Sequence, residues 1–427
     1  MVSLKTEFQT DSFINYQAQT LHIENVSLQT IAAQFGTPTY VYSHAALTQA
    51  YQRYAHAFGE KTRVCYSVKA NSNLAILQCF AQLGAGFDIV SGGELERVLA
   101  AGGNPQRVIF SGVGKTEAEM QRALEVGIHC FNVESESELF RLNQVAKSCD
   151  RIAPISLRVN PNIDAKTHPY ISTGLKENKF GIPHEEALNL YQIAHSLSHL
   201  KVIGIDCHIG SQLTELSPFL EALDRILGII DALAEKNIQI EHLDIGGGVG
   251  IFYQDEATIN LEEYAAAVRK KLAGHCLTLV LEPGRSLVGN AGVLLTKVEY
   301  LKYNAEKNFA IIDAAMNDLI RPTLYDAYHE VLPVVQYESE ESSLLNKIYD
   351  LVGPICETGD FLAKNRVLPI KEKDILAVLS AGAYGMSMSS NYNTRARPAE
   401  VMIKGNDIFV IRKREQIHDL FALEQLI

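Results

Sequence analysis

The sequence has no cysteine or histidine cluster of the kind that holds a structural metal ion. Its seven cysteines are scattered singly, without a CxxC pair. His208 has no HxH or HExxH companion, and the neighbouring Cys207 is expected on the opposite face of a strand. We therefore expect reduced thiols, and we exclude a disulfide framework, a zinc site and a metal-dependent barrel hydrolase.

Long apolar runs and clusters of basic residues are missing as well. No stretch is long enough to span a bilayer, and the amino-terminal MVSLKTEFQTDSF resembles no targeting segment. The formal net charge is −12, and no Lys/Arg run is long enough to follow a phosphate backbone. We expect a soluble, cytoplasmic protein that binds neither nucleic acid nor membrane.

What is present is ordinary globular composition over a long chain. Hydrophobic residues make up 47% of the 427 residues and charged residues 21%, which argues against disorder. A chain of this length exceeds what one hydrophobic core usually organises, so we expect two domains, or a barrel with a second module.

The central region alternates short β-type runs with amphipathic helical runs that often end in glycine. Eight runs are predicted to be strands: Arg63–Ala70, GFDIVS from Gly86, RVIFSG from Arg107, HCFNVE from His129, ISLRVN from Ile155, VIGIDCHIG from Val202, IEHLDIGGG from Ile240 and LTLVLEPGR from Leu277. Eight repeats with Val- and Ile-rich strands favour an α/β fold of the (β/α)8, TIM-barrel type. No GxGxxG follows the first strand, so a doubly wound dinucleotide-binding sheet is disfavoured.

After Arg285 the pattern changes to strands separated by turns. VLLTKVEYLKY, NFAIIDAA, KIYDLVGP, DILAVLSA, AEVMIKG and DIFVIRKRE predict a C-terminal all-β domain. We assign residues 37–285 to the barrel and 286–427 to the β domain. Residues 1–36 are too few to fold alone and are expected to join the β domain.

Reactive residues fall at the carboxyl ends of the predicted barrel strands, where active sites of this fold lie. They are Lys69, Asp88, Arg158, His208, Gly246 to Gly248, Glu282 and Arg285. Taken singly, each has a structural explanation: a solvated lysine, a core histidine, a tight glycine turn, or an ion pair between Glu282 and Arg285. Their convergence on one rim favours function.

Together these residues supply what pyridoxal phosphate requires. A lysine can form a Schiff base with an aldehyde, and a glycine-rich loop can present backbone N–H groups to a phosphate. An imidazole can stack on a ring, and a carboxylate can keep a pyridine nitrogen protonated. A protonated pyridine ring is a strong electron sink, which suits the carbanion left when CO2 departs.

The motifs resemble those of the fold-type III pyridoxal-phosphate decarboxylases, the group that contains diaminopimelate, ornithine and arginine decarboxylases and shares a two-domain architecture with alanine racemase. Nearly the whole chain is covered. The matching motifs are YSVKA around Lys69, GFDIVSGGE around Asp88, HPYISTGLKENKFGI from His168, CHIGSQ around His208, DIGGG, EPGR, GPICETGD and GAYG.

The resemblance implies a role for each motif. Lys69 would carry pyridoxal 5'-phosphate, His208 would stack on its ring, and Glu282 would pair with its pyridine nitrogen. Cys356 would protonate the substrate carbanion from the neighbouring subunit, so a homodimer with active sites at the subunit interface is implied. The other cofactor-binding residues would be Asp88, Arg158, Ser211, Gly246, Gly247, Gly248, Gly284, Arg285 and Tyr384. A buried small hydrophobe is the structural alternative for Cys356.

Within this group the resemblance is to the diaminopimelate branch, which implies decarboxylation of meso-2,6-diaminopimelate to L-lysine. It rests on CHIGSQ, STGLKENKFGI and CETGD, where Glu357 replaces the Asp that is more typical of the ornithine branch. Arg285 and Arg321 would bind the distal carboxylate in bidentate fashion, and Glu357 would meet the distal ammonium. Tyr325 and Tyr384 would also contact substrate. A structural salt bridge is the alternative for the arginines.

Other functions stay open on the residues alone. Ornithine, arginine or carboxynorspermidine could be the substrate, or the protein could be a non-catalytic barrel that binds the cofactor. An amino-acid racemase is disfavoured because racemases of this fold usually place an arginine, not a glutamate, against the pyridine nitrogen.

Overall fold

The computed structural model describes residues 13–163 and 178–427, which form two compact units. The first unit combines the chain up to Gln49 with Val288–Ile427, and the second unit is Ala50–Leu287. No helix within the two described ranges is both long and apolar enough to cross a membrane.

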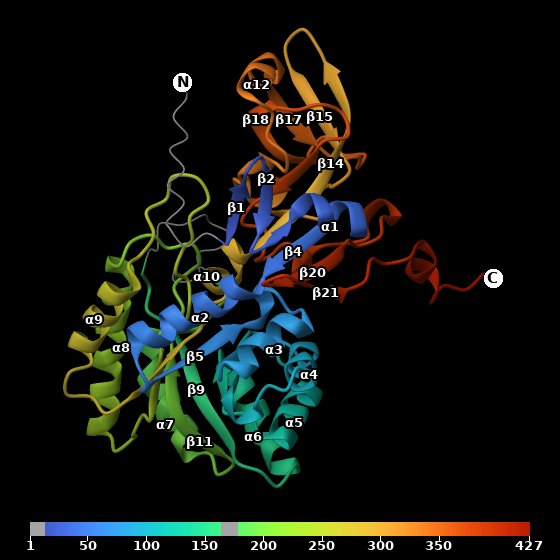
Figure 1. Cartoon of the computed structure of the whole chain (residues 1–427). Coiled ribbons are helices and arrows are strands. Elements are labelled where there is room, and N and C mark those ends of the chain that lie inside the picture. The colour runs from blue at the N-terminus through green and yellow to red at the C-terminus, as the bar shows by residue number, and fades with distance from the viewer. Residues whose placement is uncertain (1–12, 164–177) are drawn as a thin grey trace. The chain divides into compact units, whose positions relative to one another are not determined.

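The second unit is a closed barrel of eight parallel strands (Figure 1). The strands pair in the order β9-β11-β12-β13-β5-β6-β7-β8, and β8 pairs with β9 to close the ring. Their bounds are β5 Thr62–Ser67, β6 Gly86–Ile89, β7 Val108–Phe110, β8 Cys130–Val133, β9 Ala153–Asn160, β11 Leu200–Asp206, β12 His242–Asp244 and β13 Thr278–Leu281; the short β10, Ile182–Pro183, pairs with β9 outside the ring. The predicted (β/α)8 fold is confirmed, with all eight strands where the sequence indicates them.

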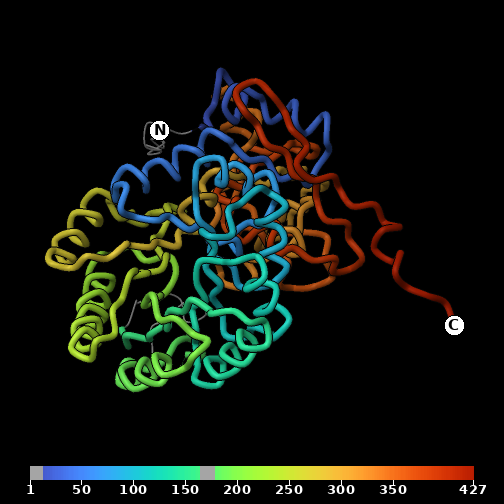
Figure 2. Tube along the Cα trace, turned by 90° about the horizontal axis from the view of Figure 1, so that it is seen from below, coloured from blue at the N-terminus to red at the C-terminus, as the bar shows by residue number. Residues whose placement is uncertain are grey.

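Helices lie outside the strands and can be followed as a ring of coils in Figure 2. They are α2 His44–Phe58, α3 Leu74–Gln82, α4 Gly92–Ala100, α5 Glu117–Val126, α6 Glu136–Ser148, α7 His184–Ser196, α8 Ser217–Glu235, α9 Leu261–Lys271 and the short α10 Arg285–Val288. Several begin at side-chain caps: Ser91 accepts the Glu94 N–H at α4, and Thr116 forms a capping box with Glu119 at α5. These caps fix where each strand-to-helix loop ends, and so where the rim residues lie.

The interior of the barrel is packed rather than hollow. Side chains from five different strands, all almost fully buried, meet in one cluster made of Cys65, Ile109, Cys130, Ile203 and Val280. A filled interior leaves the carboxyl-terminal rim as the place where polar groups can meet a ligand.

The first unit is built on a sheet with strand order β18-β17-β15-β14-β4-β20-β21, to which β16 and β19 are added. The bounds are β4 Thr39–Ser43, β14 Gly292–Tyr303, β15 Asn308–Ile312, β16 Val331–Pro333, β17 Asn346–Val352, β18 Phe361–Pro369, β19 Ile375–Val378, β20 Ala399–Lys404 and β21 Asp407–Arg412. The predicted β domain is confirmed, although it also carries the short helices α11 Arg321–Tyr325 and α12 Ser339–Leu345.

The boundary between the two units lies further along the chain than the sequence-based division into domains placed it. Strands β1 Ile14–Gln17, β2 Thr20–Ile23 and β3 Val26–Ser27 form their own antiparallel sheet, followed by α1 Leu28–Phe35. Leu21 and Ile31 pack into the same core as Val293 and Val401. Strand β4, which the segmentation placed in the barrel, pairs with β14 and β20. The two units therefore divide after Gln49 and not after residue 36, because β4 completes the sheet of the first unit.

Candidate active site

Lys69 lies on a single turn of 3-10 helix, Val68–Ala70, that follows β5, and not on the strand itself. Its Nζ is 3.3 Å from Oδ2 of Asp88, whose side chain is fully buried while that of Lys69 is 39% exposed. The same Asp88 oxygen is 2.9 Å from the Ser67 hydroxyl. A buried carboxylate therefore orients a lysine amine that remains reachable from the rim.

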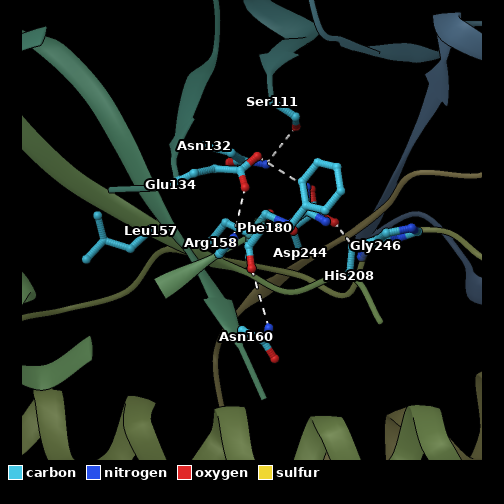
Figure 3. Close-up of polar contacts among 12 residues, drawn as sticks. Ser111, Asn132, Glu134, Leu157, Arg158, Asn160, Phe180, His208, Asp244 and Gly246 are labelled. Atoms are coloured by element: carbon cyan, nitrogen blue, oxygen red, sulfur yellow. Dashed lines mark hydrogen bonds and ion pairs between the residues drawn. The ribbon is translucent and has the colours of Figure 1, made fainter. Parts of the chain in front are cut away.

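Arg158, near the end of β9, is held by carboxylates on two sides. Its Nη1 is 3.2 Å from Oε1 of Glu134, and its Nε is 3.9 Å from Oδ2 of Asp206. Glu134 also accepts the Gly181 N–H at 2.9 Å, and the guanidinium lies 4.9 Å from the centre of the Phe180 ring (Figure 3). Arg158 thus joins the ends of three strands and fixes the chain around Phe180.

His208 follows β11 and is held in one protonation state by the glycine loop. The Gly247 N–H donates to Nδ1 of His208 at 3.2 Å, which requires that Nδ1 carry no proton. Burial, with the charges of Arg158 and Lys69, lowers the pKa of His208 well below its ordinary value. A neutral imidazole is the form suited to stacking on an aromatic ring.

The three glycines after β12 lie where no side chain would fit. A Cβ on Gly247 would lie 2.1 Å from the carbonyl oxygen of Glu282, and one on Gly248 would lie 2.3 Å from that of Gly210. Gly248 also has φ +106°, which L side chains rarely adopt. The loop therefore packs its backbone directly against the segments that carry His208 and Glu282.

Three carboxyl groups meet at the ends of neighbouring strands. Asp206 ends β11, Asp244 ends β12, and Glu282 follows β13; one oxygen of each lies within 4.8 Å of the others. Burial first, and then the neighbouring negative charges, raise the pKa of Asp206 and of Glu282 well above the ordinary range. Burial raises the pKa of Asp244 to about 7.

Arg285 starts α10 and is positioned by two hydroxyl groups. Its Nη1 donates to the Tyr253 hydroxyl at 2.8 Å, and its Nη2 donates to Oγ of Ser211 at 3.0 Å. Just before it, a Cβ on Gly284 would lie only 3.0 Å from Cβ of Ser67. Gly284 therefore lets the segment after β13 pack against the turn that carries Lys69.

In the first unit, Arg321 begins α11 and is almost fully buried. His329 Nδ1 lies 2.8 Å from the Leu379 carbonyl oxygen, to which it must donate, so His329 Nε2 accepts from Arg321 Nη1 at 2.9 Å. Tyr325, half-buried, lies one turn further along α11.

The loop that carries Cys356 and Glu357 is exposed but well defined. Asp360 accepts the N–H groups of Ile355 and Met316, each at 2.7 Å. Cys356 donates its backbone N–H to Oδ1 of Asn393 at 3.2 Å.

One further contact and one unusual backbone conformation concern the neighbouring motifs of this unit. Thr323 of α11 donates to the Gly359 carbonyl at 2.8 Å, so Arg321 and the cysteine loop belong to one local assembly. Tyr384 is half-buried and has φ +56°, a left-handed conformation that is uncommon for a non-glycine residue.

These residues fit pyridoxal phosphate. Glu282 Oε1 is buried and has no hydrogen-bond partner among the described residues, as expected of an acceptor that awaits a ring N–H. Lys69 supplies the amine, and His208 supplies a neutral ring. All of the predicted barrel residues thus lie on one rim.

Sequence reasoning missed several residues that shape this rim. Glu134, Asp206, Asp244 and Tyr253 make the contacts above, but none was singled out. Glu134 ends a predicted strand, and Asp206 and Asp244 end observed strands, so the same rule that identified Arg158 could have found them. Residues 168–177 of the HPYISTGLKENKFGI motif lie outside the described residues.

Comparison with known proteins gives a consistent result. Residues 44–289 match the family model "Pyridoxal-dependent decarboxylase, pyridoxal binding domain". The chain is 60% identical to the diaminopimelate decarboxylase of Pseudomonas aeruginosa, over 98% of this chain and 99% of that protein, and 57% identical to that of Vibrio cholerae, over 97% and 99%. The crystal structure of diaminopimelate decarboxylase from Helicobacter pylori complexed with L-lysine superposes with a TM-score of 0.89 at 44% identity, covering 93% of this chain and 98% of that one.

Proposed function

This chain belongs to the pyridoxal-dependent decarboxylases and, among them, to the diaminopimelate decarboxylases, and from that premise we propose how its residues divide the work. It is a carboxy-lyase that uses pyridoxal 5'-phosphate and releases CO2 from meso-2,6-diaminopimelate to give L-lysine. The observation that carries this function is 60% identity over nearly the whole length of both chains. The geometry of the Lys69 rim supports the cofactor assignment.

The barrel rim binds the cofactor in our proposal. When bound, pyridoxal phosphate supplies an electron sink for the pair left by the departing carboxylate. Lys69 anchors it through Nζ, which Asp88 orients, and Glu282 accepts the hydrogen of its ring nitrogen. His208, held neutral by the Gly247 N–H, supports the ring face.

The phosphate end is assigned to the glycine loop and its neighbours. Gly246, Gly247 and Gly248 place backbone without side chains at this end. The N–H groups of Gly246 and Gly247 already donate to Asp244 and His208, so Ser211 and Arg285 supply the hydroxyl and the positive charge. Gly284 keeps the adjoining backbone tight, and Arg158 holds the rim together through Glu134. We assign Tyr384 to the same end.

The substrate end is assigned to polar and charged side chains. Arg321 binds the distal carboxylate through a two-point contact and Glu357 meets the distal ammonium, while Arg285 and Tyr325 complete the carboxylate side. Ornithine lacks that distal carboxylate, so the arginine charge would go unpaired with it. The requirement for a second carboxylate therefore separates diaminopimelate from ornithine.

Cys356 donates the proton that replaces CO2 on the α-carbon. Its exposure in the described chain supports a homodimer in which the thiol serves the active site of the neighbouring subunit. All seven cysteines are free, which supports our assignment of the protein to the reducing cytoplasm.

The experiment that tests substrate choice measures CO2 release from diaminopimelate, ornithine, arginine and lysine side by side. We expect turnover with meso-diaminopimelate at least about 1,000-fold above the others in kcat/KM, because the other three lack the distal carboxylate and would leave the buried charge of Arg321 unpaired. Comparable turnover of ornithine or arginine would contradict the assignment and leave the cofactor assignment intact.

A further inference from the structure

The carboxyl cluster, defined as Asp206, Asp244 and Glu282, is more than a partner for the cofactor. Asp206 and Asp244 are directly paired in the register of β11 and β12, so their side chains are forced together by the sheet. Only Glu282 was singled out by sequence, and only Glu282 has a role in the function proposed above. The two aspartates, 1% and 0% exposed, need a physical explanation of their own.

Within residues 13–163 and 178–427, positive charge near the carboxyl cluster is scarce. Arg158 contacts Asp206 at 3.9 Å but makes its shorter contact, 3.2 Å, with Glu134. Lys69 lies against Asp88. The titratable groups that face the cluster from the surrounding strands and loops are Lys69, Asp88, Glu134, Arg158, His208 and the buried thiols Cys65, Cys130 and Cys207. In the described part of the chain, five buried carboxyl groups therefore share two cations, so the three groups of the carboxyl cluster cannot all be ionised.

The hydrogen-bonding pattern indicates where protons belong. Asp206 Oδ1, Asp244 Oδ2 and Glu282 Oε1 have no donor among the described residues. The carboxyl groups of Asp244 and Glu282 lie within hydrogen-bonding reach of each other, yet two carboxylates cannot bond without a proton between them. The other Asp244 oxygen already accepts the Gly246 N–H at 2.8 Å. Added protons would make the orphaned Asp206 and Asp244 oxygens donors, whereas Glu282 Oε1 keeps its role as the acceptor of the ring N–H.

We propose that Asp206 and Asp244 are positioning residues that store protons: Asp206 is a neutral acid, and Asp244 shares a second proton with Glu282. The proton forms an O–H···O bond between the two groups, and a single net negative charge remains on the cluster. That charge is the one that Glu282 presents to the ring nitrogen. The inference deepens the proposed role of Glu282 and rests on it.

A metal ion is the competing explanation for three convergent oxygens. The position of Arg158 argues against it, since a guanidinium 3.9 Å from Asp206 would repel a divalent cation at the same oxygens. A proton compensates the charge without needing the six or more ligands of a hard cation.

The test uses infrared spectroscopy of the intact holoenzyme, in which a protonated carboxyl group gives a carbonyl band distinct from that of a carboxylate. Asp206→Asn and Asp244→Asn each keep the shape and an acceptor oxygen. We expect both variants to lose intensity from the protonated-acid band at pH 7. Glu94 and Asp318, whose pKa values are raised to about 7, contribute equally to all samples, so only differences from wild type are read.

Asp224→Asn is the matched control, because Asp224 lies on the barrel unit but pairs with Lys271 at the surface. Its spectrum in the acid band should equal that of wild type. We expect Asp206→Asn to bind the cofactor within about threefold of wild type, since an amide mimics a neutral acid.

Either of two results would overturn the inference. An unchanged acid band in both aspartate variants would mean that these groups are ionised. Loss of the protonated-acid band of wild type on adding Mg²⁺, with recovery on adding a chelator, would identify a metal site. The acid band is also measured in the apoenzyme, so it tests the protonation of the aspartates without the cofactor. Failure of the cofactor assignment would appear instead as the absence of visible absorbance in the wild-type protein. The two failures are therefore distinguishable.

Discussion

Arg321 is buried against a neutral imidazole, and that setting suits a carboxylate-binding role. Its hydrogen bond to His329 Nε2 fixes the guanidinium without removing its charge. A planar group held in this way can present two parallel N–H donors, which a lysine ammonium cannot reproduce.

We therefore predict that Arg321→Lys raises KM for diaminopimelate by at least about tenfold, a loss of about 1.4 kcal/mol in binding. The visible absorbance of bound cofactor should not change, because Arg321 is assigned to the substrate. Steady-state kinetics with an absorbance spectrum of the same sample check both points.

Arg366→Lys is the matched control at this scale. Arg366 contacts the carbonyl oxygen of the same His329 through Nη2 at 3.2 Å and packs on Tyr328. Its KM should stay at the wild-type value. An unchanged KM in Arg321→Lys would show that Arg321 is structural.

At the scale of elements, the turn after β12 depends on the absence of side chains. Gly247 faces the Glu282 carbonyl oxygen so closely that a methyl group would force backbone apart. This contact joins the glycine loop to the segment that carries Glu282, so a methyl group at position 247 would displace both segments.

Gly247→Ala should weaken cofactor affinity by at least about tenfold and lower stability by about 2 kcal/mol or more. Gly228→Ala in α8 is the control, because nothing lies within 4 Å of the new methyl group and the helix gains about 1 kcal/mol of propensity. Denaturant unfolding should shift in opposite directions in the two variants, and only Gly247→Ala should weaken binding in a cofactor titration. Equal behaviour would show that close packing of the loop is unimportant.

Helices and strands differ in how clearly the sequence predicts them. The eight barrel strands were predictable because each is a short apolar run next to an amphipathic helical pattern, and several of the preceding helices end in glycine, as α5 does at Gly127. Strand β18 was not, since Asn365 at φ +54° breaks the alternation and shifts the pairing with β17. Strand β4 is fully buried, and its partners β14 and β20 lie hundreds of residues away, so the sequence alone did not separate it from the barrel residues that follow it.

The same contrast holds for the site. Lys69 and His208 stand in motifs and at strand ends, so sequence places them on the rim. Asp206 and Asp244 stand at strand ends too, but their importance depends on burial and on the scarcity of nearby cations, which only three-dimensional packing defines.

For the whole molecule, buried histidines link stability to pH. Burial lowers the pKa of His242 to about 3, and that of His129 to about 4, so both are neutral in the folded barrel at pH 5 but protonated when it unfolds. Because the unfolded chain then binds more protons, these two groups make the free energy of unfolding rise with pH between about 4 and 6.5. Above that range their contribution is constant.

The variant His242→Asn should therefore show a shallower rise than wild type, by at most about 1.4 kcal/mol per pH unit in that window. Urea unfolding at several pH values between 4 and 8 measures the difference in slope. Parallel curves for the two proteins would contradict the assignment of a neutral, buried His242.

The central claim is that Lys69 holds the cofactor on the barrel rim. Borohydride reduction of the purified holoenzyme, followed by peptide mass mapping, tests it most directly because reduction fixes pyridoxal phosphate permanently on the amine that carries it. We predict one label per chain, on the peptide that contains Lys69, and no label or visible absorbance in Lys69→Ala. A label on any other lysine, or none on wild type, would contradict the account.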